Sequence, residues 1–181
     1  MQYVVLLRGI NVGGRNKVAM PALRDHLGEH FGAVRSYIQS GNVLLESDRS
    51  AAQVAAHIEQ SLPTAFALDS ALVRVLVLDE DAYRRVVAQA PPGFGDDPKT
   101  YRYDVGFYLG ATRDEVEPHL VANPEVDEVV CGDLAFYHRR VIALASRSWL
   151  TRIIGKPVYG SLTLRNWRTT TTLHGMLDAP A

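Results

Sequence analysis

The sequence lacks the features that mark several protein classes. Its 181 residues include one cysteine, Cys131, which excludes an internal disulfide framework and fits a reducing compartment. No apolar run reaches the length that crosses a bilayer, and the run at residues 3–7 is typical. No secretory leader is visible, because Arg8 and Asn11 interrupt the N-terminal apolar run. We therefore expect a soluble, cytoplasmic protein without a membrane partner.

Acidic residues are missing from one long stretch. Residues 134–177 hold 7 basic and no acidic residues, whereas residues 79–133 hold 13 acidic and 5 basic ones, although the whole chain carries a net charge of only −1. A basic segment of this kind attracts phosphate or carboxylate groups. The alternative is that it pairs with the acidic segment before it, and the sequence leaves both open.

The overall composition indicates a folded, globular chain. Apolar residues make up 47% and charged residues 22%, which is usual for a protein that buries a core. The length fits one domain or two small ones.

The first half predicts the order β-α-β-β-α-β-α. Pro21, Ser50 and Asp79 are typical helix-start residues, and apolar side chains recur after them at helical spacing. The Gly41-Asn42 pair predicts a two-residue type II′ hairpin turn. The expected strands are residues 2–8, 35–40, 42–47 and 72–78.

The same order recurs after a Pro- and Gly-rich linker. Thr112 and Glu115 predict a capping box, for a helix that stops at Asn123-Pro124, and Asn166 predicts the N-cap of the last helix. In residues 103–109 the alternation places Tyr103 inward and both Gly106 and Tyr108 outward. The expected strands are residues 103–109, 126–131, 134–138 and 158–164, with a short helix ending at Gly155.

This repetition predicts an α+β fold with an internal duplication. A β-α-β-β-α-β unit is the ferredoxin-like, split-βαβ arrangement, here an antiparallel sheet with helices on one face. We expect a first unit at residues 1–90, a linker at 91–102 and a second unit at 103–181.

A glycine-rich basic loop follows the first strand. Glycines allow close approach to backbone N–H groups, while arginine, lysine and asparagine side chains suit an anion. The spacing of Gly9 and Gly14 matches a P-loop, but Arg15 and Asn16 replace its Lys and Ser/Thr. The alternative is a structural loop whose asparagines bond its own backbone. The candidate ligand-binding residues are Arg8, Asn11, Gly13, Gly14, Arg15, Asn16 and Lys17.

Two further segments complete the candidate site. Gln39 and Asn42 flank the hairpin turn, where turn geometry alone explains Asn42. Arg165, Asn166 and Trp167 stand at a strand-to-helix junction, where a helix N-terminus favours anions. The indole could stack on a base or fill the core.

The other motifs do not indicate a catalytic or metal-binding site. Residues 26–30 (HLGEH) match a zinc-protease pattern, but no third ligand follows, so we expect no metal site. Cys131 is expected to be a half-buried structural thiol. Asp127 and Glu128 are adjacent in a strand and so point to opposite faces, which excludes a carboxylate pair.

Both ends of the chain resemble a bacterial domain-of-unknown-function family. Members of that family open with an LLRGINVGG motif, continue to a YIQSGNV hairpin and close with a TTRNW-like segment. Here these are residues 6–14 (LLRGINVGG), 37–43 (YIQSGNV) and 163–169 (TLRNWRT). The resemblance implies a tandem α/β fold and no established activity or cofactor.

The leading hypothesis is a site for a phosphorylated ligand, either a nucleotide or a nucleic-acid backbone. Two alternatives remain open, an enzyme acting on a small phosphorylated substrate and an interaction module that forms a homodimer. The sequence offers no obvious general base or nucleophile near the loop.

Overall fold

The computed structural model describes residues 1–179, which divide into two compact units. The first unit holds residues 1–83 together with residues 173–179, and the second holds residues 84–172. The range expected as a linker, 91–102, therefore lies inside the second unit. Within residues 1–179 no helix is long and apolar enough to span a membrane.

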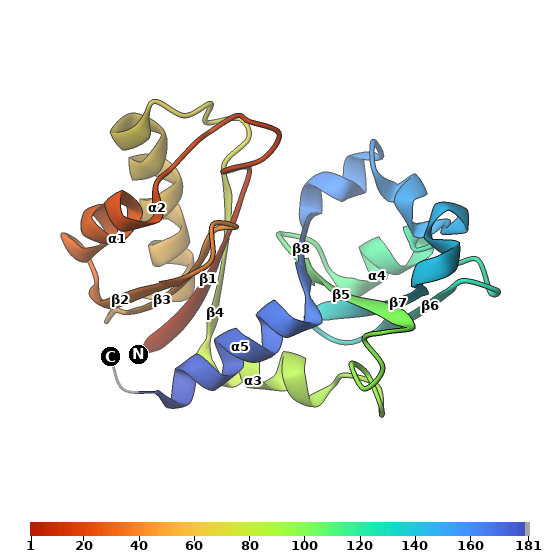
Figure 1. Ribbon diagram of the computed structural model, residues 1–181. Helices are drawn as coiled ribbons and strands as arrows, with labels where there is room; N and C mark the ends of the chain where they lie inside the picture. Colours follow the sequence, from red (N-terminus) through yellow and green to blue (C-terminus); the bar gives the residue numbers. More distant parts are fainter. Residues whose placement is uncertain (180–181) are drawn as a thin grey trace. The chain divides into compact units, whose positions relative to one another are not determined.

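The first unit contains a four-stranded antiparallel sheet with the order β2-β3-β1-β4 (Figure 1). Its elements in chain order are β1 (Gln2–Arg8), α1 (Met20–Gly28), β2 (Gly32–Tyr37), β3 (Asn42–Glu46), α2 (Ala51–Phe66) and β4 (Arg74–Asp79). Helix α3 (Glu80–Ala88) follows and crosses the unit boundary.

Side-chain caps begin two of these helices, as the sequence predicts. Ser50 forms a full capping box with Gln53 at the start of α2. Asp79 accepts a hydrogen bond from the backbone N–H of Ala82, at 2.7 Å, at the start of α3.

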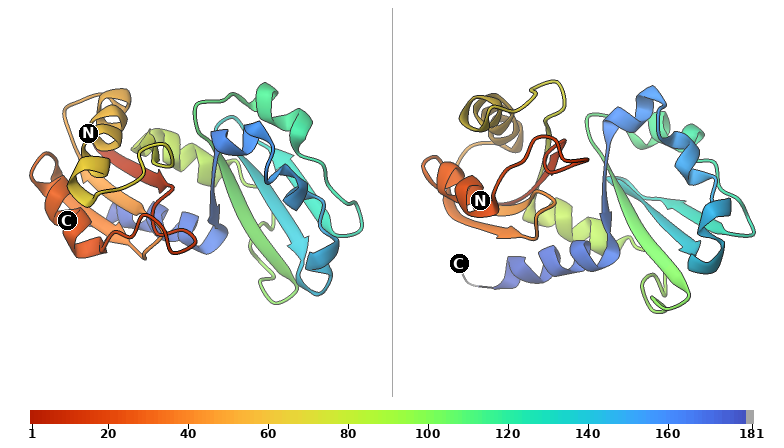
Figure 2. Two further views of the ribbon diagram at one scale, coloured as in Figure 1. Left: turned by 90° about the horizontal axis from the view of Figure 1, so that it is seen from above. Right: turned by 45° about the horizontal axis from the view of Figure 1, so that its top comes forward.

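Both faces of the first sheet are covered, which corrects the expectation of helices on one face. Helices α1 and α2 pack on the face that carries Tyr3, Val5 and Leu7 (Figure 2). Val4 and Leu6 point the other way and are also fully buried. The end of helix α5 (Trp167–Asp178) belongs to this unit.

The predicted two-residue hairpin turn is wrong. Tyr37 pairs with Asn42, so residues 38–41 form a longer connection between β2 and β3. Ile38 and Gly41 have φ values of 50° and 73°. The Leu7 N–H donates a 2.8 Å hydrogen bond to the Gly41 carbonyl and so fixes the position of Gly41, although the two residues are far apart in sequence.

The second unit repeats the strand order in another antiparallel sheet, β6-β7-β5-β8. Short 3₁₀ turns occupy residues 142–147, 150–153 and 157–161, where the first unit has a long helix. The strands are β5 (Tyr101–Tyr108), β6 (Asp127–Cys131), β7 (Ala135–Val141) and β8 (Leu162–Asn166), and α4 (Arg113–Val116) with a 3₁₀ turn at Glu117–His119 lies between β5 and β6.

Several expectations for this unit need correction. The Thr112–Glu115 capping box is confirmed, but α4 ends at Val116 rather than near Asn123. The segment expected as a strand from residue 158 becomes extended only at Leu162.

The second half of β5, from Val105 to Tyr108, is buried on both faces, so the expectation that Gly106 and Tyr108 point to solvent is wrong. Tyr108 is 6% exposed and packs with Phe136 and Leu162 under the 3₁₀ turns. A Cβ on Gly106 would lie 2.2 Å from the Phe136 ring, so only glycine fits beneath it.

Candidate functional site

Side-chain hydrogen bonds to the backbone brace the glycine-rich loop. The Nδ2 amide of Asn16 donates to the Gly9 carbonyl at 2.8 Å, and its Oδ1 accepts from the Asp69 N–H at 3.0 Å. Asn11 makes three comparable bonds, to Val18 and to the carbonyl of Gln39. Both asparagines have positive φ, 53° and 47°. These side chains therefore bond backbone groups, as the structural alternative predicts.

The tip of the loop is what remains exposed. An isolated bridge joins Val12 to Arg15, with Gly13 and Gly14 between them. A Cβ on either glycine would meet nothing within 4 Å, whereas one on Gly9 would overlap the Leu72 carbonyl oxygen at 1.8 Å. Glycine is therefore required at position 9 by close packing against Leu72. The backbone of Gly13 and Gly14 is unobstructed and lies beside the exposed Arg15.

The other predicted residues of the first unit differ in exposure. Asn42 is fully buried and donates to the Tyr37 carbonyl at 3.1 Å and to Ser40 Oγ at 2.8 Å, so it stabilises the turn. Gln39 and Lys17 are exposed, and Arg8, at the end of β1, is half-buried.

Arg165, Asn166 and Trp167 belong to the second unit, at the junction of β8 and α5. Arg165 is 9% exposed, and its Nη1 donates to Thr163 Oγ1 and the Leu164 carbonyl at 3.0 and 2.8 Å. Asn166 Oδ1 accepts from the Thr169 N–H at 2.7 Å, which confirms the predicted N-cap.

A pocket of about 790 Å³ opens beside Trp167. The aromatic residues Tyr101, Tyr103 and Trp167 line it together with Arg102 and Arg168. The remaining lining residues are Gly95, Pro98, Ile142, Asn166 and Thr171. All belong to the second unit.

Packing fixes the indole at this pocket. The Phe94 ring meets the Trp167 ring edge-on, with centroids 5.2 Å apart. Gly95, at φ 100°, lies so close that a Cβ there would be 2.3 Å from the indole nitrogen. Trp167 is half-buried, so it packs on one side and lines the pocket on another.

Register explains why β5 contributes to this pocket. Asp104 pairs with Asn166, so β5 residues before Asp104 extend past the end of β8 and lie beside the start of α5. Tyr101 and Arg102 were not predicted as site residues, because they lie at the end of the range expected as a linker. An alternating Tyr-Arg-Tyr pattern at a strand start was the available signal.

The cations of the acid-free segment divide into two kinds. Arg139 and Arg147 form ion pairs with Glu128 and Glu125, so these two cations pair with the acidic segment, as the alternative predicts. Arg168 makes no ion pair with any residue between 1 and 179. It is therefore a pocket cation available to a ligand.

The buried polar cluster around Asp127 serves the fold. Its carboxylate accepts from Ser148 Oγ at 2.7 Å and from the Trp149 N–H at 2.8 Å, and contacts His138 Nε2 at 3.0 Å. Ser148 contacts the carboxylate rather than the imidazole, and the residues are buried, so the cluster does not form a nucleophilic triad.

The remaining chemical candidates point away from catalysis. Cys131 is half-buried, and burial raises the pKa of its thiol, which disfavours the reactive thiolate. Glu128 is exposed while Asp127 is buried, so the two carboxylates are on opposite faces, as predicted. Among residues 1–179, His, Cys, Asp and Glu side chains form no group of three or more that could hold a metal ion.

Comparison with known proteins gives a family without an assigned activity. The family model described as a protein of unknown function (DUF1697) matches residues 1–137. A solved structure, that of the conserved bacterial protein SP0830 from Streptococcus pneumoniae, is 27% identical with a TM-score of 0.84. The match covers 97% of this chain and 98% of that one. No curated protein matches. The resemblance noted in the sequence is confirmed, and the chain belongs to the DUF1697 family of proteins of unknown function.

Proposed function

We propose that the protein binds a phosphorylated ligand of the nucleotide class at the pocket beside Trp167. One observation carries the proposal: two arginines and three aromatic residues line the same pocket at the start of a helix. Arginines bind phosphate through charge-assisted hydrogen bonds, and aromatic rings stack on nucleobases. Neither group alone indicates a nucleotide, but together they match its two chemical parts.

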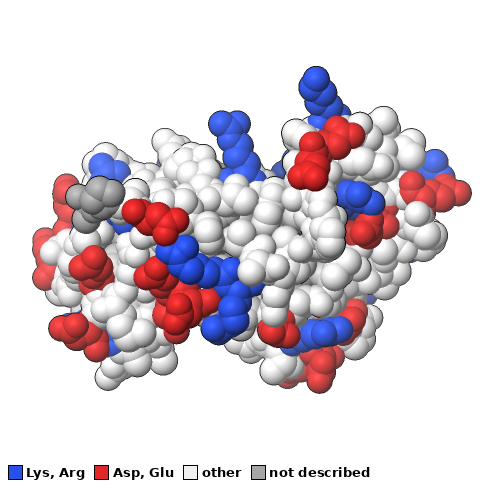
Figure 3. Space-filling view, turned by 90° about the horizontal axis from the view of Figure 1, so that it is seen from below, with Lys and Arg blue, Asp and Glu red and all other residues white. Residues whose placement is uncertain are grey.

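A free nucleotide fits the surface charge better than a long nucleic acid. Basic and acidic side chains are intermixed on the face drawn in Figure 3, without a broad basic area. The chain as a whole carries a net charge of −1. Nucleic-acid binding usually draws on a basic patch that replaces several counterions.

The loop of the first unit is proposed as a second contact for anions. Its exposed tip offers Arg15, Lys17 and the unobstructed backbone of Gly13 and Gly14. Because the asparagines already brace the backbone, little conformational entropy is lost when an anion binds there.

Trp167 gives a direct test of the pocket. The chain has two tryptophans, so W149F leaves Trp167 as the only indole. We would titrate this variant with inorganic phosphate, a nucleoside monophosphate, a nucleoside triphosphate and a short single-stranded DNA, following fluorescence and thermal unfolding. We expect saturable quenching by nucleotides, weakened about tenfold by R168Q, since one charge-assisted contact is worth about 1.4 kcal/mol.

Two comparisons sharpen this test. K156Q removes an exposed cation of the same unit that does not line the pocket, and it should leave affinity unchanged. A steep fall of DNA affinity with salt, exceeding that of the nucleotides, would instead favour nucleic acid. Absence of any fluorescence or thermal response to all four probes would overturn the proposal.

We further propose that the two units are a tandem pair of ferredoxin-like folds. The support is the equivalent strand order, β2-β3-β1-β4 and β6-β7-β5-β8, in which the first strand lies between the third and the fourth. The 3₁₀ turns at residues 142–161 then stand where the second helix of that arrangement is expected.

A further inference from the structure

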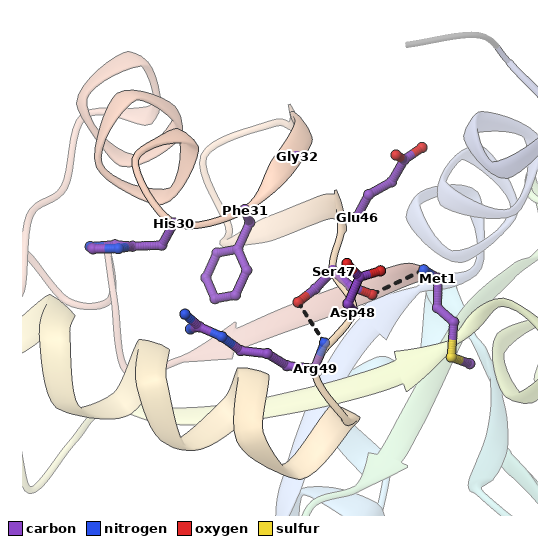
Figure 4. Close-up of a pocket in the computed structure, with 8 residues that line it drawn as sticks. All are labelled: Met1, His30, Phe31, Gly32, Glu46, Ser47, Asp48 and Arg49. Atoms are coloured by element: carbon purple, nitrogen blue, oxygen red, sulfur yellow. Dashed lines mark hydrogen bonds between the residues drawn. The ribbon is translucent and has the colours of Figure 1, made fainter.

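A second pocket, in the first unit, is lined by charged side chains of both signs. It measures about 410 Å³ and lies where the end of β3 meets the residues that follow α1 (Figure 4). Its lining residues are Met1, His30, Phe31, Gly32, Glu46, Ser47, Asp48 and Arg49. Nothing in the proposed nucleotide site involves these residues.

One side of this pocket carries the Arg49 guanidinium and an imidazole. The Arg49 guanidinium lies 5.5 Å from the centroid of the Phe31 ring, and the imidazole of His30 lines the same pocket. His57 packs against His30 with ring centroids 4.5 Å apart, and its Nε2 is buried without a hydrogen-bond partner in the structure. Within residues 1–179, neither Arg49 nor His30 forms an ion pair.

The other side carries two carboxylates together with the α-ammonium group of Met1, which donates to the Ser47 carbonyl at 2.9 Å. In Figure 4 the carboxylates of Glu46 and Asp48 lie across the Phe31 ring from the guanidinium of Arg49. Both acidic residues are exposed, and neither has an ion-pair partner within the described residues 1–179. The Phe31 ring thus separates the Arg49 guanidinium from the two carboxylates.

Hydrogen bonds between side-chain hydroxyls and the backbone hold Arg49 in place. Tyr3 Oη donates to the Arg49 carbonyl at 2.8 Å, and the Arg49 N–H donates to Ser47 Oγ at 3.1 Å. Ser50, the next residue, caps α2. The guanidinium is therefore presented from a fixed backbone, which reduces the entropy cost of binding.

We propose that this pocket binds a small zwitterion, an amino carboxylic acid of the size of a free amino acid or dipeptide. Its carboxylate would bond the Arg49 guanidinium, its ammonium would bond Glu46 and Asp48, and its apolar part would contact Phe31. A phosphate would face two carboxylates, and a simple cation would face a guanidinium, so each is disfavoured by like charge.

The test uses ligands that carry one charge or both. The full chain is titrated by isothermal calorimetry and ligand-observed NMR with leucine, glycine and glycylglycine, and with N-acetyl-leucine and leucinamide. Leucine should bind about tenfold more tightly than either blocked form, because each lost contact removes about 1.4 kcal/mol. Comparing the affinities of glycylglycine and glycine shows whether the pocket prefers a dipeptide or a free amino acid.

Single-charge variants complete the experiment. R49Q and E46Q should each weaken leucine binding about tenfold. R74Q and E29Q, exposed charges of the same unit outside the pocket, should not. Thermal unfolding of each variant verifies folding. Equal binding of N-acetyl-leucine and leucine, wild-type affinity in R49Q, or no binding by any zwitterion at millimolar concentration would overturn the proposal.

Discussion

The side chain of Asn11 forms hydrogen bonds in both directions with the backbone of Val18. Nδ2 donates to the Val18 carbonyl at 3.0 Å, and Oδ1 accepts from the Val18 N–H at 2.8 Å. The same Nδ2 donates to the carbonyl of Gln39 at 3.0 Å. One amide thus closes the glycine-rich loop and ties it to the β2–β3 connection.

Replacing Asn11 should destabilise the first unit measurably. N11A removes three hydrogen bonds and places alanine at a φ of 53°, so we expect a loss of about 2–4 kcal/mol in the free energy of unfolding. N11G removes the same bonds without the backbone strain and should lose about 1 kcal/mol less. Urea denaturation measures both, and equal values for N11G and wild type would show that the bonds contribute nothing.

Two glycines of the same loop should respond very differently to alanine. A Cβ on Gly9 would lie 1.8 Å from the Leu72 carbonyl oxygen, so G9A must displace backbone and should cost about 3 kcal/mol or more. Gly13 also has positive φ, but its Cβ would meet nothing, so G13A should cost only about 1–2 kcal/mol. Thermal or urea unfolding compares the pair, and similar losses would contradict the steric argument.

Local signals were sufficient where a side chain bonds nearby backbone. Ser50, Thr112 and Asn166 were predictable as helix caps, because each bonds an N–H only three residues away. The four-residue connection at 38–41 was not predictable in this way, since its geometry depends on Leu7, which is distant in sequence. Short-range patterns do not contain such contacts.

Long-range packing also explains the other differences. Alternation in β5 suggested one buried face, but Tyr108 is covered by 3₁₀ turns from residues 142–161, which carry no clear periodicity. The candidate pocket was half predictable for the same reason. Trp167 stood in a recognisable junction, whereas Tyr101 reaches it only through the register that pairs Asp104 with Asn166.

Asn166 allows the structural and ligand roles of one residue to be separated. N166A removes the cap of α5 and should lower the free energy of unfolding by about 1 kcal/mol. N166S keeps a capping oxygen and should restore most of that loss. If the side-chain amide also contacts the ligand in the proposed nucleotide pocket, N166S should keep its stability but bind nucleotides more weakly. Chemical denaturation measures the stability, and fluorescence titration measures the binding.

The buried imidazole of His138 should make stability depend on pH near neutrality. Burial lowers the pKa of His138 below its usual 6.5, although Asp127 acts in the opposite direction. The unfolded chain therefore binds a proton at this residue more readily, and stability falls as pH drops below about 6.5. H138Q should show a shallower decline between pH 7 and pH 5, measured as urea midpoints, and an unchanged slope would contradict this assignment.

Asp127 should dominate the loss of stability at lower pH. Burial raises the pKa of its carboxyl, but hydrogen bonds from Ser148, His138 and the backbone N–H groups of Asn123 and Trp149 outweigh it and lower the pKa to about 2. A depressed pKa stabilises the folded state above the unfolded value of 3.8, and this stabilisation is lost as pH falls through about 2. The difference corresponds to about 2 kcal/mol.

The neighbouring carboxylate provides a matched control for this prediction. D127N should lose about 2 kcal/mol or more at pH 7 and should lack the acid-dependent decline between pH 4 and pH 2 that the wild type shows. E128Q changes an exposed carboxylate on the opposite face of β6 and should shift stability by about 0.5 kcal/mol or less. Equal effects of the two substitutions in chemical denaturation would contradict the view that the buried hydrogen bonds hold Asp127 ionised.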